Sequence, residues 1–272
     1  MNDTRYVAFI DILGFKNIVN NFNDPKALGA QLLINFNSAL AVAINEKSTS
    51  IDISQNKFPK VQSKEISFYQ FSDSIILYSN DNKIHSLEKM VRTLNIFMAK
   101  SLLKGFPLRG ALVKDSLFSN PPIIVGKSII RAVKLESAQE WSGIVIDSSC
   151  FDNSEEKELL QFLLTKKLVC ETDVPIKGKD RNEIEFQKHI VINWPQFIGM
   201  YISSFTEVEQ CFTKYSGKPD KNALSKIKFT IDFLKNNLGT KRLPPFVYSA
   251  TIIDNFTSNF KENIEFELYH DE

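Results

Sequence analysis

The chain has 272 residues, of which 43% are hydrophobic and 24% are charged, and this composition excludes the disordered, collagen-like and coiled-coil classes. Its 33 basic and 32 acidic side chains leave a formal charge of +1, so no overall field attracts nucleic acid or an anionic membrane. No apolar run approaches the roughly 18 residues of a membrane span, and no cleavable signal pattern is visible. The three cysteines form no CxxC pair, so we predict a reducing, cytoplasmic setting with neither a disulfide framework nor a zinc site.

Residues 5–11 form an apolar run that predicts a buried strand, and this run ends on a carboxylate, Asp11. A carboxylate at that place costs free energy unless it is hydrogen-bonded, paired or bound to a metal. The next segment, 23–44, predicts one long amphipathic helix with Asp24 as its N-cap and Pro25 at its first position. The polar residues 45–65 predict a loop.

Two β-like runs within 66–79 meet at Ser72, Asp73 and Ser74, a composition that predicts a tight turn between antiparallel strands. Apolar spacing predicts a helix over 85–104 that ends at Gly105. We then expect a strand within 106–118, a short strand that enters a helix over 123–140, and a strand at 143–149. Beyond residue 150 the pattern predicts a helix and a strand within 155–169, a strand at 188–194, and one or two helices over 203–237.

This order of elements through residue 150 is that of the split βαβ, ferredoxin-like arrangement, and it predicts an α+β fold. We divide the chain into residues 1–150 and a mainly helical C-terminal elaboration, residues 151–272, that packs on the same domain.

The predicted arrangement brings Asp11 and Asp73 together, because the first and third strands of a ferredoxin-like sheet lie side by side at its centre. Two adjacent carboxylates repel each other unless a cation lies between them, and a pair of Mg²⁺ ions held in this way serves in-line displacement at phosphorus. The backbone N–H groups of Leu13, Gly14 and Phe15 would then face a triphosphate. The alternative is that Asp11 caps the next helix and Asp73 fills a turn.

The sequence FIDILGF, residues 9–15, resembles the strand-to-helix signature of class III nucleotidyl cyclases, and FYQFSDSI, residues 68–75, resembles the hairpin that carries their second metal-binding aspartate. The segments PLRGALV, IIVGKSIIRAVKLES and GIVID resemble the strands and helix that complete their catalytic domain. The resemblance covers roughly residues 5–148 and implies that residues 1–150 are a nucleotidyl cyclase catalytic domain.

The resemblance implies that Asp11, Asp73 and the carbonyl oxygen of Ile12 bind two Mg²⁺ or Mn²⁺ ions. It also implies the reaction: the ribose 3′-hydroxyl of a nucleoside triphosphate attacks the α-phosphorus, pyrophosphate leaves, and a 3′,5′-cyclic mononucleotide remains. The metal ions would lower the pKa of the hydroxyl and neutralise the phosphates. Members of the family act as head-to-tail homodimers with composite active sites, so the implied partner is a second copy of the chain.

Two positions that read a purine base in the family differ in this chain. Tyr69 replaces a base-reading Lys, and Ile123, three residues before Gly126, replaces a base-reading Asp. The loss of both predicts a pyrimidine substrate, UTP in preference to CTP, because the Tyr69 ring can fill the space that a small base leaves. This pattern is similar to the stand-alone bacterial pyrimidine cyclases of anti-phage defence, the Pycsar type, whose product, here cUMP, would act on a separate effector.

The family's transition-state Asn and Arg align with Ile130 and Lys134. Lys134 keeps the charge without the guanidinium fork, so Arg131 and Arg109 are further candidates for a phosphate contact. The alternative is a solvated helix face for Lys134 and Arg131, and a structural ion pair for Arg109. The two losses also leave open a catalytically silent cyclase-like module that binds a nucleotide or a partner. A third hypothesis is a ferredoxin-like transferase that joins two nucleotides.

Overall fold

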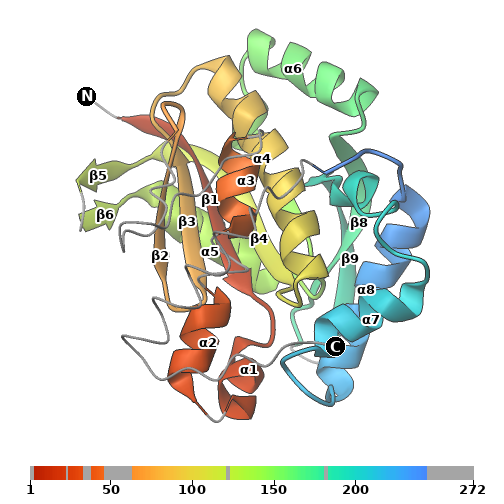
Figure 1. Ribbon diagram of the computed structural model, residues 1–272. Coiled ribbons are helices and arrows are strands. Elements are labelled where there is room, and N and C mark those ends of the chain that lie inside the picture. The colour runs from red at the N-terminus through yellow and green to blue at the C-terminus, as the bar shows by residue number, and fades with distance from the viewer. Residues whose placement is uncertain are drawn as a thin grey trace.

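The computed structural model describes residues 3–22, 24–32, 38–45, 63–120, 123–180 and 183–243. The fold is mixed α+β, with a mostly antiparallel seven-stranded sheet in the order β2-β3-β1-β4-β7-β9-β8 and a separate hairpin of β5 and β6. Helices cover both faces of the sheet: α3 and α4 lie on one face and α5 on the other (Figure 1).

The central strand is β1 (Thr4–Ile12), which pairs antiparallel with β3 (Ser74–Ser79) and with β4 (Leu108–Ser116). On the β3 side, β2 (Ile66–Phe71) forms one edge of the sheet. On the β4 side, β7 (Ile144–Ile146) is parallel to β4, and β9 (Ile184–Ile192) and β8 (Val169–Lys177) continue the sheet to the other edge. The small hairpin consists of β5 (Phe118–Asn120) and β6 (Ile123–Val125).

The remaining elements are helical. They are α1 (Phe15–Asn21), α2 (Pro25–Gln31), α3 (Ser38–Asn45), α4 (Ile84–Leu103), α5 (Lys127–Ala138), α6 (Ser154–Thr165), α7 (Phe205–Thr213), α8 (Lys221–Asn237), and the short 3₁₀ turns η2 (Ser148–Phe151) and η3 (Trp194–Phe197). Within the described part of the chain, no helix is both long enough and apolar enough to cross a membrane.

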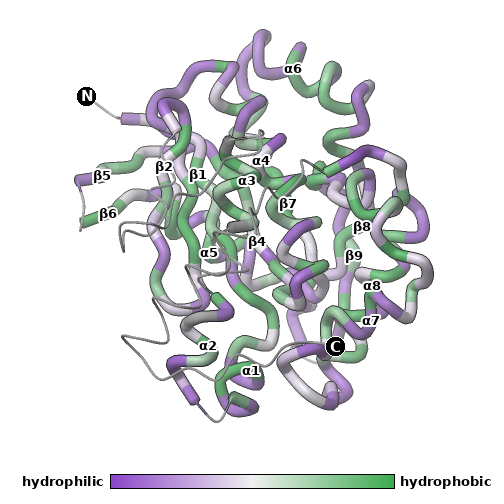
Figure 2. The backbone as a smooth tube through the Cα atoms, viewed as in Figure 1, coloured by the Kyte–Doolittle hydropathy of each residue, from purple (hydrophilic) through white to green (hydrophobic). Residues whose placement is uncertain are grey.

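Alternate residues of β1 face two different hydrophobic cores, because successive side chains of a strand point to opposite faces of its sheet. Ala8 and Ile10 belong to the larger core under α4, whereas Val7 belongs to the smaller core under α5. Figure 2 shows that hydrophobic residues are concentrated on these central strands. This alternation places Asp11 on the α5 face, two residues beyond Phe9, which packs against the smaller core.

Several local predictions are confirmed. The Asp24 side chain caps α2 by accepting a hydrogen bond from the Lys26 N–H at 2.9 Å, with Pro25 at the first position. The hairpin of β2 and β3 turns at Ser72 and Asp73, and α4 ends before Gly105, whose φ is +89°. Of the helix predicted over 23–44, the described residues form the two helices α2 and α3, and residues 33–37 lie outside the description. Most of the loop predicted over 45–65 also lies outside it.

The C-terminal elaboration contains the predicted helices α6, α7 and α8 together with two nine-residue strands, β8 and β9. The prediction placed only the start of β8 and the end of β9 correctly. At the start of β9, Ile184 and Phe186 alternate with polar residues, a strand-like pattern that the prediction did not use. The two strands extend the same sheet that contains β1, as Figure 1 shows.

Candidate functional site

Asp11 and Asp73 lie at the same end of the two central strands. The register pairs Asp11 of β1 with Ser74 of β3, the residue that directly follows Asp73. The Ile12 N–H also donates a hydrogen bond to the Asp73 carbonyl oxygen at 3.2 Å, which ties the end of β1 to the β2–β3 turn. The turn closes because Ser72 adopts a left-handed conformation with φ 55°. The pairing of the strands therefore brings together two carboxylates that are distant in the sequence.

The environment of Asp11 disfavours its negative charge. Burial of the carboxyl raises the pKa of Asp11 from 3.8 to about 7, and the charges of Asp73 and Glu136 act in the same direction. The guanidinium of Arg109 lowers the pKa, and a hydrogen bond between the carboxyl groups of Asp11 and Asp73 raises it. The net direction is upward, because burial and the neighbouring carboxylates together outweigh the effect of the Arg109 guanidinium. Such a site favours a proton or a metal cation.

Arg109 lies directly opposite Asp11 on β4, but its guanidinium is bound by other groups. Its Nε donates to Glu136 Oε1 at 2.5 Å, and its Nη1 donates to the Gln139 carbonyl oxygen at 2.7 Å. Both members of the ion pair are buried. Of the two roles that the sequence left open for Arg109, the structure shows the structural ion pair. Its contact with a phosphate stays a prediction.

The residues present fit a hard divalent cation. Two carboxylates and the nearby carbonyl of Ile12 offer only oxygen atoms, which are the donors that Mg²⁺ and Mn²⁺ prefer. Among the described residues, no cluster of three or more His, Cys, Asp or Glu side chains is arranged to hold a metal ion. The protein would thus supply two carboxylates and leave the remaining coordination positions to phosphate and water, as Mg²⁺ sites that bind nucleotides do.

The loop after Asp11 is held by its own hydrogen bonds. The Leu13 N–H donates to the Pro107 carbonyl oxygen at 2.9 Å, so this amide is used within the fold and does not face a phosphate as predicted. Gly14 has a φ of 76°, and Phe15 begins α1, a helix of seven residues. The predicted contact of Gly14 and Phe15 with a triphosphate stays a prediction.

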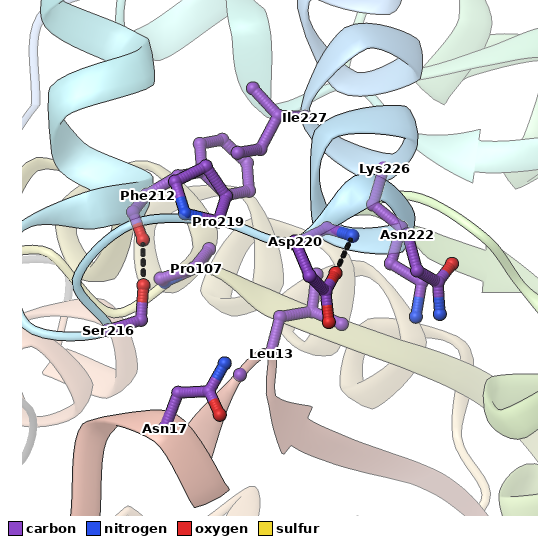
Figure 3. Close-up of a pocket in the computed structure, with 12 residues that line it drawn as sticks. Leu13, Asn17, Pro107, Phe212, Ser216, Pro219, Asp220, Asn222, Lys226 and Ile227 are labelled. Atoms are coloured by element: carbon purple, nitrogen blue, oxygen red, sulfur yellow. Dashed lines mark hydrogen bonds between the residues drawn. The ribbon is translucent and has the colours of Figure 1, made fainter. Parts of the chain in front are cut away.

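Leu13 and Gly14 also line a small cavity of about 170 Å³ between the β1–α1 loop and the helices α7 and α8. Figure 3 shows Leu13 and Asn17 on one side of this cavity, and Ser216 and Asp220 on the other. The C-terminal part of the chain therefore forms one wall of the cavity that borders the β1–α1 loop.

The other predicted residues lie farther along the sheet and on α5. Tyr69 is on β2 opposite Ile76 and is partly buried. Ile123, Ile130 and Lys134 are exposed, the first on β6 and the other two on α5.

Arg131 is also exposed on α5, where its guanidinium makes an ion pair with Asp147 at 2.6 Å. Within one copy of the chain, the outward face of α5 presents Arg131 and Lys134 to solvent, whereas Glu136 of the same helix is buried beside Arg109.

Glu136 is the residue of this site that the sequence prediction missed. The sequence signal is weak, because the buried face that Glu136 shares with Ser128 and Ala132 is formed by small residues and carries no hydrophobic stripe. A carboxylate on a buried helix face needs a partner, and an arginine within a buried strand is a suitable one.

No protein-family model matches the chain, and no curated protein matches its sequence at a significant level. The functional inference therefore depends on the geometry of the site and on the sequence motifs that form it.

Proposed function

We propose that the protein is a class III-type nucleotidyl cyclase that converts a nucleoside triphosphate into a 3′,5′-cyclic mononucleotide and pyrophosphate. The substrate is a pyrimidine triphosphate, UTP in preference to CTP, and the setting is second-messenger synthesis in the cytoplasm during bacterial anti-phage defence. The observation that carries the proposal is the pair Asp11 and Asp73, two carboxylates at adjacent strand ends where burial and mutual repulsion raise the pKa of Asp11 to about 7.

The strand order supports the proposal. In the order β2-β3-β1-β4 the first and third strands are central neighbours and all three pairings are antiparallel. This is the order that a ferredoxin-like domain requires, and it places the ends of β1 and β3 together.

The chain's own residues have three tasks in this reaction. Asp11 and Asp73 would hold the cations, and both carboxyl groups would have to be deprotonated to do so, because metal ligands must be deprotonated. When bound, the cations supply charge stabilisation to the phosphates and acidity to the 3′-hydroxyl. The buried pair of Arg109 and Glu136 fixes the strand position opposite Asp11. Tyr69, on β2, would contact the base.

An exposed apolar surface supports a homodimer. Phe118, Ile123 and Val125 of the β5–β6 hairpin are each more than half exposed, and Ile130 of α5 is 73% exposed. Large side chains of this kind are costly to leave in water when they are grouped, and a second copy would cover them. In such a dimer, Lys134 and Arg131 reach the triphosphate from the copy that does not hold the metal ions.

A second candidate is a catalytically silent module that binds a nucleotide. The observation that favours it is that the guanidinium of Arg109 is bound by Glu136 and the Gln139 carbonyl, and that Ile130 stands where the family has its Asn. In that case Asp11 and Asp73 would still bind a metal–triphosphate complex without turnover.

The experiment is product analysis by mass after incubation with each of ATP, GTP, CTP and UTP in the presence of Mn²⁺. We expect a cyclic monophosphate from one pyrimidine triphosphate in the wild type and in Asp173→Asn, which changes an exposed carboxylate on β8. We expect no product in Asp73→Asn. Full activity of Asp73→Asn would refute the proposed site. Tight Mn²⁺-dependent binding without product from any triphosphate would establish the silent module, and a dinucleotide product would establish a transferase.

A further inference from the structure

We infer that the segment between α7 and α8, residues 214–220, positions the β1–α1 loop, and that Tyr215 is the residue through which it acts. The inference gives the C-terminal elaboration a task in the site, and it rests on the proposed function, under which that loop borders the phosphates. Under this inference, Tyr215 contacts none of the reacting atoms and acts as a positioning residue.

Tyr215 contacts two separate elements of the N-terminal part of the chain. Its ring stacks on Phe106 with the ring centroids 5.1 Å apart and an interplanar angle of 29°. The same ring lies 5.6 Å from the ring of Phe22, which follows the end of α1. The Asn21 side chain also donates a hydrogen bond to the Tyr215 carbonyl oxygen at 3.3 Å. One residue of the C-terminal part thus joins the end of α1 to the turn between α4 and β4.

These two elements hold the β1–α1 loop from both sides. Phe106 is followed by Pro107, whose carbonyl oxygen accepts the hydrogen bond from the Leu13 N–H at 2.9 Å. Phe22 follows the last residue of α1, which is only seven residues long, so a shift at its end is transmitted to Gly14 at its start. The position of the loop relative to Asp11 therefore depends on where Phe106 and Phe22 are held.

Two glycines border the contacts of this segment. A Cβ atom on Gly105 would lie 2.9 Å from the Tyr215 ring, and the φ of Gly105 is +89°. A Cβ atom on Gly217 would lie 2.8 Å from the side-chain nitrogen of Asn21, the group that donates to the Tyr215 carbonyl oxygen, and the φ of Gly217 is +70°. A left-handed backbone at these two positions suits glycine and almost no other residue. Glycine at position 105 therefore leaves room for the Tyr215 ring.

The cavity beside the β1–α1 loop explains why loss of the Tyr215 ring would let the loop move. Leu13 and Gly14 border an open space of about 170 Å³ on the side of α7 and α8, so continuous packing does not restrain the loop there (Figure 3). Without the Tyr215 ring, the loop has room to move toward this space. A shift of about 1 Å is enough to impair the alignment of reacting groups.

The experiment compares Tyr215→Ala with Tyr215→Phe and with a matched control, Phe229→Ala. Tyr215 contacts Phe106 and Phe22 through its ring and Asn21 through its carbonyl oxygen, so Tyr215→Phe keeps these contacts. Phe229 is a partly buried ring of α8 whose contact is with Phe186, 5.6 Å away. Two quantities are measured in the full chain: amide hydrogen exchange, and the affinity for UTP with Mn²⁺, determined by calorimetry with a UTP analogue whose α and β phosphorus atoms are joined by a methylene group, so that pyrophosphate cannot leave.

The amides of Leu13, Asn17 and Ile18 are suitable reporters, because each donates a hydrogen bond in the structure. We expect them to exchange at least about tenfold faster in Tyr215→Ala, and the affinity for UTP to fall by about tenfold. Both quantities should stay at the wild-type values in Tyr215→Phe and in Phe229→Ala. Unchanged exchange at these amides in a folded Tyr215→Ala variant would overturn the inference, as would equal acceleration in Phe229→Ala.

A second variant and a second readout cover the cases in which Tyr215→Ala does not fold or the protein binds no triphosphate. If Tyr215→Ala does not fold, Phe22→Leu removes the ring contact from the α1 side and must accelerate the same amides. If the wild type binds no triphosphate, the proposed function fails, but the exchange measurement still decides whether Tyr215 positions the loop.

Discussion

Replacing Asp11 with asparagine should change the free energy of unfolding of the metal-free protein more favourably at about pH 8 than at about pH 4.5. In the wild type, burial of the carboxyl and the charge of Asp73 raise the pKa of Asp11 from 3.8 to about 7. The folded state therefore retains a proton that the unfolded state has released. The contribution of this retained proton to the free energy of unfolding is complete below about pH 4 and is lost as the pH rises through about 7.

The size of the effect follows from the shift in the pKa. A shift of about three units corresponds to about 4 kcal/mol, since each unit is worth about 1.4 kcal/mol. Asp11 is only partly buried, and solvent screening reduces this value to about 2 kcal/mol. Between about pH 4.5 and about pH 8, the free energy of unfolding of the wild type should fall by that amount relative to Asp11→Asn.

Urea denaturation of both proteins at the two pH values measures the difference, and Asp173→Asn, at an exposed position of β8, serves as the control. Added Mg²⁺ at the higher pH should raise the stability of the wild type and leave Asp11→Asn unchanged, because a cation binds only the intact carboxylate pair. A difference between wild type and Asp11→Asn that is the same at both pH values would show that the charge of Asp11 is not disfavoured in the folded state.

Three other substitutions test the electrostatics and the backbone by urea denaturation. Glu156→Gln removes the countercharge of the nearly buried Lys114 ammonium, 2.5 Å away, and should cost about 3 kcal/mol. Arg131→Ala breaks a pair whose guanidinium is exposed and should cost less than about 1 kcal/mol; equal losses would contradict this contrast. Gly105→Ala should cost about 1–2 kcal/mol, because its φ is +89° and the added Cβ meets the Tyr215 ring; a neutral result would show that the turn can relax.

The features that local chemistry determines were predictable from the sequence. Asp24 and Pro25 mark the start of α2, Gly105 follows the end of α4, and the polar turn at Asp73 separates two β-like runs. The closeness of Asp11 and Asp73 was also predictable, since it follows from the strand order once the element order is known. Their binding of metal ions stays a prediction.

The features that depend on the choice of a distant partner were not predictable. Arg109 had several possible partners, and only the packing of α5 on the sheet shows that Glu136 is the one it binds. Tyr215 lies in a polar loop segment whose sequence gives no sign of a contact with Phe22 and Phe106.

The central place of β1 has a consequence for the synthesis of the protein. β1 leaves the ribosome before its partners β3 and β4, and Asp11 meets its neighbour on β4, Arg109, only after about 100 further residues have been made. At about 5–20 residues per second this takes about 5–20 s, during which the β4 edge of the apolar strand β1 stays unpaired. Unpaired apolar strands tend to aggregate, so the nascent chain has a period of vulnerability that chaperones would shorten. The carboxylate pair can form within that period, because Asp73 and β3 precede β4 in the chain.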